Sequence, residues 1–250
     1  GSEYHQRGYM AAYDANNGNE LWRWWAVPGD PSLGFEQPEL EMAAKTWNGP
    51  FWEKGGGGTP WDGILYDPQT DLVIFGTGNG APWPAEVRSP GGGDNLFTAS
   101  IVALDVKTGE YRWHFQEVHH DIWDYDAPNP IVLFEAEYNG VMRKGLAQAG
   151  KTGWVYILDR LTGEPLIGIE EKAVPQEPRQ ATAATQPYPV GDALIPLEVQ
   201  YAPENYELIN NGAIFTPFYE TTVFTPLAGV NWPPSAYDPT TNYMFICATD

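Results

Sequence analysis

A turn motif that recurs along the whole chain limits what this sequence can fold into more than any other feature. Residues 13–22 and 104–113 share an aspartate, a glycine four positions later and a tryptophan eight positions later, and residues 158–163 repeat the motif without the tryptophan. Looser copies that begin with Tyr-Asp-Pro occupy 66–71 and 237–242. Each copy joins β-rich runs and has turn-forming residues at its centre. The sequence therefore predicts a β-hairpin at every copy.

The spacing of these copies indicates how the hairpins assemble. Their aspartates are 53, 38, 54 and 79 residues apart, near the length of one four-stranded propeller blade with insertions. We expect the tryptophan of each full copy to dock between neighbouring blades as part of the scaffold. Helix signals are limited to residues 39–45, and the Pro-rich stretch 174–203 predicts a long loop or insertion. The prediction is an all-β chain, with residues 1–250 forming about half the ring of a large β-propeller.

Charge and composition exclude several classes of partner. The 250 residues contain 13 Lys and Arg against 33 Asp and Glu, a formal net charge of −20. Nucleic acid and anionic membrane surfaces are met by clustered basic residues, so neither is an expected partner. No run of 18 apolar residues predicts a membrane span. The first residues lack a Met and a signal-type region, which indicates an excised piece. Cys247 has no disulfide partner and is expected to be a buried small hydrophobe.

The densest cluster of ionisable residues is His119-His120-Asp121-Ile122-Trp123-Asp124-Tyr125-Asp126. In extended chain Asp124 and Asp126 point to one face, where their charges repel unless a cation or a shared proton neutralises them. A hard metal ion such as Ca²⁺ meets that need. An acidic, solvated loop is the alternative. Zinc is disfavoured, because the two histidines are adjacent and no cysteine accompanies them.

Three further positions are candidates for a binding site. Asn79, in Gly-Thr-Gly-Asn-Gly, can offer an amide oxygen to a metal or can simply form a turn. Trp61 follows four glycines and can stack on a planar cofactor or belong to the core. The glycine run lacks the Lys-Ser/Thr of a P-loop, which excludes that type of phosphate site. Lys151, between glycines, can face an anion or lie exposed in a turn.

Taken together, these motifs resemble the quinoprotein alcohol dehydrogenases, which are eight-bladed propellers with tryptophan-docking repeats that bind pyrroloquinoline quinone (PQQ) and a metal ion. The resemblance runs over nearly all 250 residues in a consistent order. It implies metal ligation by Glu3, Asn79, Asp124 and Asp126. It implies PQQ contacts from Thr59, Trp61, Lys151 and Asn231.

The resemblance also implies a reaction. A primary alcohol or an aldose would be oxidised to the aldehyde or lactone, with Asp124 as general base and Lys151 stabilising charge on the quinone. Electrons would pass to a cytochrome c or a quinone, and the protein would be periplasmic or secreted. Asp126 is typical of lanthanide-using members, but membrane glucose dehydrogenases with a divalent metal share the Asp-x-Asp pattern. The ion is therefore Ca²⁺ or a lanthanide.

Two other classes of protein also explain the repeats. A non-catalytic periplasmic propeller that serves protein assembly would need the same blades, but it would not need Glu3, Asn79, Asp124 and Lys151 together. A carbohydrate-active propeller would stack sugars on aromatic side chains and hydrolyse them with a carboxylate pair.

Overall fold

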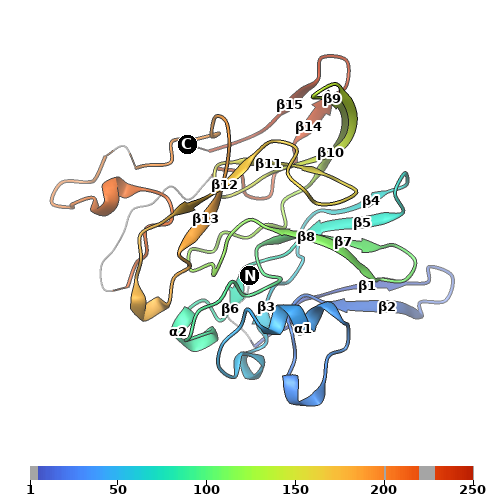
Figure 1. Cartoon of the computed structure of the whole chain (residues 1–250), viewed down its shortest axis with the longest axis horizontal. Helices are drawn as coiled ribbons and strands as arrows, with labels where there is room; N and C mark the ends of the chain where they lie inside the picture. The colour runs from blue at the N-terminus through green and yellow to red at the C-terminus, as the bar shows by residue number, and fades with distance from the viewer. Residues whose placement is uncertain (1–4, 200, 220–228, 250) are drawn as a thin grey trace.

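The structure, a computed structural model, describes residues 5–199, 201–219 and 229–249, and it consists mainly of short antiparallel strands (Figure 1). The strands are β1 (Tyr9–Tyr13), β2 (Glu20–Trp25), β3 (Gly56–Gly57), β4 (Ile64–Asp67), β5 (Leu72–Gly76), β6 (Gly80–Ala81), β7 (Ser100–Asp105), β8 (Tyr111–Gln116), β9 (Val132–Tyr138), β10 (Val141–Ala149), β11 (Val155–Asp159), β12 (Ile169–Ala173), β13 (Thr185–Pro189), β14 (Ala236–Asp238) and β15 (Tyr243–Phe245). The predicted helix is confirmed as α1 (Glu39–Ala44), and α2 (Ala85–Arg88) is a single turn that the sequence did not predict. Within the described ranges, no helix has the length and apolar content that crossing a bilayer requires.

The repeated motif forms turns of the fold, and four of its five copies form the predicted hairpins, whereas the copy at 158–163 closes only through a bridge between Leu158 and Pro165. Four copies connect β1 to β2, β4 to β5, β7 to β8 and β14 to β15, and the copy at 158–163 follows β11. In the copy that begins at Asp105, the carboxylate accepts the amide hydrogen of Lys107 at 2.9 Å, and the Asp105 carbonyl accepts that of Gly109 at 2.9 Å. Gly109 has a φ of 72°, which glycine adopts without strain. The aspartate and the glycine are therefore both required by the turn.

The tryptophan of each full copy docks on a later copy of the motif along the chain. Trp22 donates its indole N–H to the Val106 carbonyl at 3.0 Å, and Trp113 donates to the Arg160 carbonyl at 3.2 Å. The rings lie on glycines: a Cβ on Gly109 would be 2.6 Å from the Trp22 ring, and one on Gly163 would be 2.6 Å from the Trp113 ring. The prediction of inter-blade tryptophan docking is confirmed.

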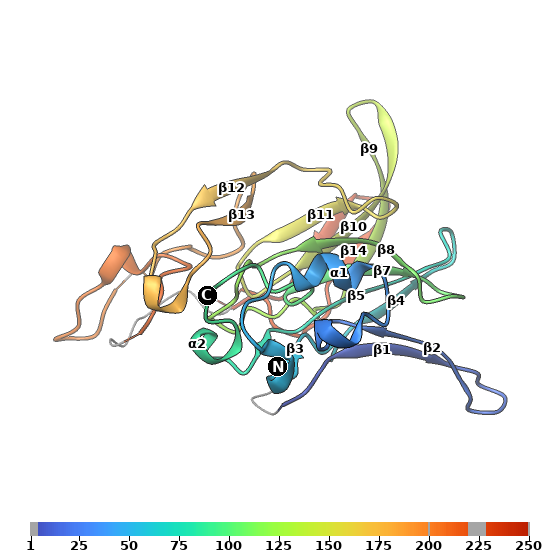
Figure 2. The same cartoon turned by 60° about the horizontal axis from the view of Figure 1, so that its bottom comes forward.

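The four-stranded sheet β4-β5-β7-β8 lies between two other sheets. Alternate side chains of a strand point to opposite faces, so one face of this sheet packs on β1–β2 and the other on β10–β11. In β5, Val73 and Phe75 pack in the hydrophobic cluster on the β1–β2 side. Leu72 and Ile74 pack in the cluster on the β10–β11 side. All of β5 is consequently buried. Figures 1 and 2 show the sheets in chain order from β1–β2 through β4–β8 to β9–β11.

The Pro-rich stretch 174–203 is not a loop throughout. Residues 185–189 form β13, which pairs antiparallel with β12 and extends with it to one side of the stacked sheets (Figure 1). This pairing is possible because its two prolines lie in a two-stranded sheet, where each strand has a free edge for residues that lack an N–H.

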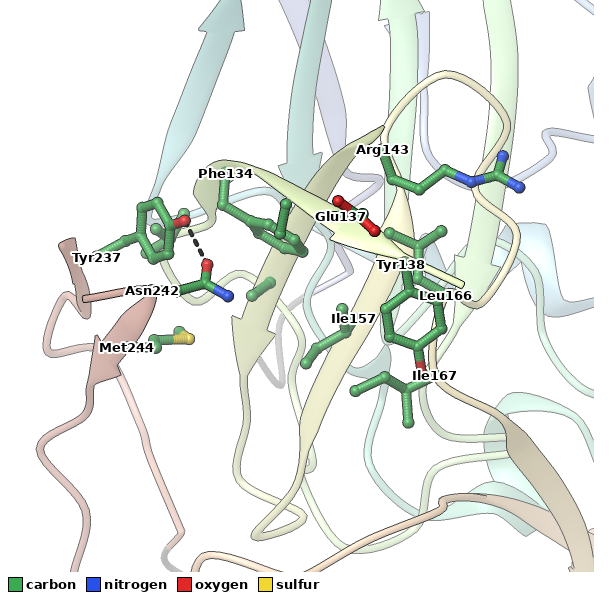
Figure 3. A pocket seen from close by; sticks show the side chains of 13 residues that line it. Phe134, Glu137, Tyr138, Arg143, Ile157, Leu166, Ile167, Tyr237, Asn242 and Met244 are labelled. Carbon is green, nitrogen blue, oxygen red and sulfur yellow. Dashed lines mark hydrogen bonds between the residues drawn. The ribbon is translucent and has the colours of Figure 1, made fainter. Parts of the chain in front are cut away.

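The last hairpin, β14–β15, is followed by Cys247 and borders an apolar pocket. Cys247 follows β15 and is exposed, so the expectation that it is buried was wrong. The hairpin that precedes it, β14–β15, forms a sheet of two strands. An apolar pocket separates β14–β15 from the β9–β11 sheet and is lined by Phe134, Ile157 and Met244 among others (Figure 3). None of the predicted site residues lines this pocket.

Candidate functional site

The predicted site residues that the structure describes gather at the ends of the strands opposite the repeated turns. The connection into an antiparallel hairpin and the connection out of it share the edge away from its turn. Trp61 precedes β4 and Asn79 follows β5, while Asp124 and Asp126 follow β8. Lys151 follows β10, and Asn231 precedes β14. The topology therefore brings residues from five separate connections to one edge.

The segment that carries the two aspartates crosses the end of β5. Ala127 donates its amide hydrogen to the Thr77 carbonyl at 3.0 Å. The Ala127 carbonyl occupies the place where Gly76 would have a side chain, because a Cβ there would lie 1.5 Å from that oxygen. Only glycine permits this approach, which sets Asp126 beside the loop that contains Asn79.

Lys151 binds both aspartates. Its ammonium group donates to Asp126 Oδ2 at 2.6 Å, to the Asp124 main-chain carbonyl at 2.7 Å and to Asp124 Oδ2 at 3.3 Å. The side chain of Asp126 is 2% exposed, that of Lys151 11% and that of Asp124 38%. The repulsion expected between the two carboxylates is thus offset by a lysine that is 25 residues or more away in the sequence.

Asp126 also joins the other two candidate residues to this cluster. Its Oδ1 accepts the amide hydrogen of Asn79 at 2.7 Å and the indole N–H of Trp61 at 3.4 Å. The Thr59 carbonyl accepts the amide hydrogen of Gly78 at 3.1 Å, which ties the Trp61 loop to the Asn79 loop. The structure therefore brings together Thr59, Trp61, Asn79, Asp124, Asp126 and Lys151.

The ionisable groups differ in their electrostatic environments. Burial raises the pKa of Asp124, the nearby Asp126 raises it further, and Lys151 offsets only part of the rise. Burial also opposes ionisation of Asp126, but Lys151 and the Asn79 amide outweigh it and lower the pKa of Asp126. Burial disfavours the charged form of Lys151, yet the two aspartates outweigh it and raise the pKa of Lys151. Asp121, fully buried three residues before Asp124, has its pKa raised to about 6, chiefly by burial.

The backbone of Asp124 is strained. Its φ is 68°, in the left-handed region that residues other than glycine seldom adopt. The Asp124 carbonyl is held by Lys151 in this conformation. Backbone strain of about 1–3 kcal/mol is maintained most often at functional positions, where surrounding contacts determine the geometry. This residue is accordingly the strongest candidate for a chemical role in the cluster.

A cavity of about 480 Å³ opens onto the exposed side of Asp124. Lys151 and Asn231 line it as well, so Asn231 lies on the same cavity as Asp124. Trp232, which no sequence motif singled out, lines it too, with 62% of its surface exposed. A sequence signal for Trp232 is its place in the Asn-Trp-Pro-Pro run, directly after the predicted site residue Asn231 and before two prolines.

The residues present fit a metal ion and a planar cofactor. Asn79 is 2% exposed, and its Oδ1 accepts no hydrogen bond within the described part of the chain. An unpartnered buried oxygen is costly, and a hard cation such as Ca²⁺ or a lanthanide would satisfy it. Trp61 keeps 40% of its surface exposed for stacking. Glu3, the remaining predicted ligand, lies outside the described residues, and those residues contain no metal-binding group of three or more His, Cys, Asp or Glu.

The adjacent histidines face away from the aspartates. His119 Nε2 lies 3.1 Å from Glu171 Oε1, and its Nδ1 lies 2.8 Å from Gln116 Oε1. Both ring nitrogens of His120 contact main-chain carbonyls, those of Gly93 and Gln180. These contacts hold the loop in place.

Comparison with known proteins gives one consistent result. The family model described as "PQQ: Glucose/ethanol/alcohol dehydrogenase, beta-propeller domain" matches residues 1–250. Quinohemoprotein alcohol dehydrogenase ADH IIB of Pseudomonas putida is 52% identical over 172 residues, which are 68% of this chain and 25% of that protein. The solved quinohemoprotein alcohol dehydrogenase ADHIIG of Pseudomonas putida HK5 is 38% identical, with a TM-score of 0.74 over 98% of this chain and 34% of that one.

A europium-containing methanol dehydrogenase is similar in structure as well. It is 28% identical, with a TM-score of 0.67 over 98% of this chain and 41% of that one. This chain therefore spans about a quarter to two fifths of the length of the relatives it resembles. The predicted propeller fold is confirmed by these matches.

Proposed function

The chain belongs to the family of PQQ-dependent glucose, ethanol and alcohol dehydrogenase β-propellers, and on this premise we propose that its native polypeptide oxidises a primary alcohol or an aldose. The product would be the aldehyde or the lactone. The observation that carries the proposal is the cluster of Asp124, Asp126 and Lys151, which opens to a cavity through Asp124 and contacts Trp61 and Asn79 on its buried side.

Asp124 is the proposed general base. It is the more exposed of the two aspartates, and it lines the cavity through which a substrate hydroxyl can approach. A base must come within hydrogen-bond reach of the proton that it removes, and Asp126, buried and bonded on both oxygens, does not meet that condition. The Lys151 ammonium keeps positive charge at this point, where it can stabilise negative charge that develops during the reaction.

The cofactor and the ion have distinct places in this proposal. Trp61 would stack on PQQ, with Thr59, Lys151 and Asn231 at its edge. Asn79 Oδ1 and Asp124 would bind the metal ion, with Asp126 adding negative charge and Glu3 as a further ligand. PQQ, when bound, supplies the two-electron redox chemistry, and a metal ion polarises it as a Lewis acid. The resemblance to a europium-containing enzyme supports a lanthanide, and Ca²⁺ satisfies the same oxygen donors.

The proposed electron acceptor and location rest on the resemblance to the family. Several are named quinohemoproteins or dehydrogenase subunits, which supports a cytochrome or a quinone as the acceptor of electrons. A periplasmic or secreted location is proposed on the same resemblance. The acidic surface, with its net charge of −20, would favour a basic partner.

The test is PQQ binding and dye-linked alcohol oxidation by the native polypeptide with Ca²⁺, with La³⁺ and with a chelator. Metal-dependent binding with turnover is the expected result. Absence of PQQ binding under all three conditions would contradict the proposal and would favour a non-catalytic scaffold. Hydrolysis of a glycosidic bond without dye reduction would instead identify a carbohydrate-active propeller.

The choice of ion has a separate test in Asp126→Ala. Removing one negative oxygen should weaken activity with La³⁺ more than activity with Ca²⁺, because a trivalent ion depends more on negative charge around it. Asp14→Ala, in the β1–β2 turn, is the control for a lost aspartate away from the site. Equal losses with both ions would contradict the lanthanide assignment.

A further inference from the structure

Two buried amide side chains connect the segments that form the site. Gln148 is fully buried near the end of β10, and Asn129, with 1% of its surface exposed, lies three residues after Asp126. We propose that Asn129 and Gln148, together called the amide clamp, are positioning residues that fix Lys151 against the two aspartates. The inference rests on the proposed function, because it concerns the geometry of the same site.

Each amide nitrogen donates both of its hydrogens to main-chain carbonyls. Gln148 Nε2 donates to the Ala127 carbonyl at 2.8 Å and to the Asn129 carbonyl, so it holds the segment that begins at Asp126. Asn129 Nδ2 donates to the Ala149 carbonyl at 2.9 Å and to the Val230 carbonyl at 2.9 Å. The two side chains thus bind each other's segments reciprocally.

The residues that Asn129 binds lie one or two positions from predicted site residues. Ala149 is two residues before Lys151, and Val230 immediately precedes Asn231. Val230 donates its own amide hydrogen to the Gly150 carbonyl at 3.0 Å, which draws its segment onto the Lys151 turn. Three segments, around 126–129, 149–151 and 230–231, are therefore fixed relative to one another at the base of the cluster.

The amide clamp acts by donating hydrogen bonds. Neither Asn129 Oδ1 nor Gln148 Oε1 has a hydrogen-bond partner among the residues that the structure describes. A buried apolar residue of similar size would fill the space but would leave four carbonyls without these donors. Because Lys151 approaches Asp126 at 2.6 Å and Asp124 Oδ2 at 3.3 Å, a small shift of its turn changes these contacts first.

The test uses variants of nearly unchanged shape that remove the donors, Asn129→Asp and Gln148→Glu, in the native polypeptide. A displacement of about 1 Å at a reactive group can cost on the order of 10²-fold in rate. We expect kcat for PQQ-linked oxidation to fall roughly 10- to 100-fold with the alcohol KM changed less than about twofold. Asn129→Ser, which keeps one donor and adds no charge, is the milder variant if the acidic ones do not fold, and its kcat should fall less.

A second measurement needs no cofactor. The Lys151 amine, 11% exposed and held by three contacts, should react slowly with an amine-modifying reagent in apoprotein, and the clamp variants should react about 10-fold faster because the turn is released. The destabilised control is Asp67→Asn, since Asp67 is the buried partner of Arg160 at the turn end of the sheets, away from Lys151.

The outcomes separate the two proposals. Faster labelling of Lys151 with a selective fall in kcat, both absent from Asp67→Asn at equal loss of thermal stability, is the expected result. Unchanged labelling in the clamp variants would overturn the clamp even if the enzyme is active. A wild-type protein without PQQ-linked turnover would overturn the proposed function, while the labelling would still decide whether the clamp positions Lys151.

Discussion

The two ends of the stacked sheets each contain a basic side chain between a buried and an exposed carboxylate, and the comparison separates scaffold from site. At the turn end, Arg160 lies 3.2 Å from Asp67, which is 1% exposed, and 3.2 Å from Glu135, which is 46% exposed. At the site end, Lys151 lies between Asp126, 2% exposed, and Asp124, 38% exposed. Charge and burial are closely matched.

The two sets of charged residues differ in their surroundings. Asp67 is committed to its own turn, where it accepts hydrogen bonds from Gln69 N and Thr70 Oγ1, and the Arg160 carbonyl receives the Trp113 indole. At the other end Asp124 has a left-handed backbone and borders a cavity. Satisfied groups stabilise the fold, whereas a strained, half-exposed carboxylate is available for chemistry. Buried ion pairs alone therefore do not identify a site.

The largest expected effect is that of Asp124→Asn on turnover in the native polypeptide. The variant keeps the shape and tolerates the left-handed backbone, but it removes the proposed base, which should lower kcat by about 10²–10⁴-fold. The free energy of unfolding should not fall, because removing the Asp124 charge also removes its repulsion with the Asp126 charge. Dye-linked kinetics and urea unfolding measure the two quantities. Turnover within a few fold of wild type would remove Asp124 from the mechanism.

The corresponding substitution at the turn end, Asp67→Asn, should lower the stability of the protein and leave its turnover unchanged. It leaves the buried Arg160 guanidinium without its buried anion, which costs about 3–5 kcal/mol of unfolding free energy. Turnover per folded molecule should be unchanged at temperatures where the variant is folded. A stability loss below about 1 kcal/mol would mean that this pair behaves like an exposed one.

Glu117 extends the comparison to a buried carboxyl group that has no basic partner among the described residues. Burial raises its pKa well above the ordinary value, and Tyr156, whose hydroxyl donates to the Glu117 carbonyl at 3.4 Å, has a raised pKa as well. The stability that protonated Glu117 contributes is fully present below its unfolded pKa, and it is lost as the pH rises toward the folded pKa. The loss is about 1.4 kcal/mol per pH unit.

Glu117→Gln should therefore remove this decline and stabilise the protein at neutral pH. Unfolding measured from pH 4 to pH 8 in both proteins gives the difference directly. Parallel curves for the two proteins would show that Glu117 is not the group responsible.

The smallest expected effect concerns the tryptophan docking at the turn end. Gly163 and Gly18 have nearly equal φ angles, 75° and 76°, but only Gly163 lies against a tryptophan ring. Gly18→Ala should cost about 1–2 kcal/mol for the backbone alone. Gly163→Ala should cost about 1–3 kcal/mol more, because its Cβ would meet Trp113. Equal losses in thermal unfolding experiments would show that the ring moves aside without cost.

The sequence itself determined the hairpins and the repeat, because the interactions that make each turn lie within a few residues. Asp105, Lys107 and Gly109 close their turn among themselves, and a reader of the sequence can recognise that set. The same holds for α1 and for the gathering of carboxylates around Asp124. The residue types that carry chemistry were therefore visible before the fold.

Only the tertiary structure decided how those residues meet. Lys151 reaches Asp124 across 27 residues, and Asn129 reaches Val230 across 101, so no local pattern encodes either contact. The exposure of Cys247 and the strand at residues 185–189 likewise depend on which strands pair beside them. The physical reason is that turns are made by neighbouring residues, whereas burial, neutralisation of charge and strain arise from segments that come together only when the sheets pack.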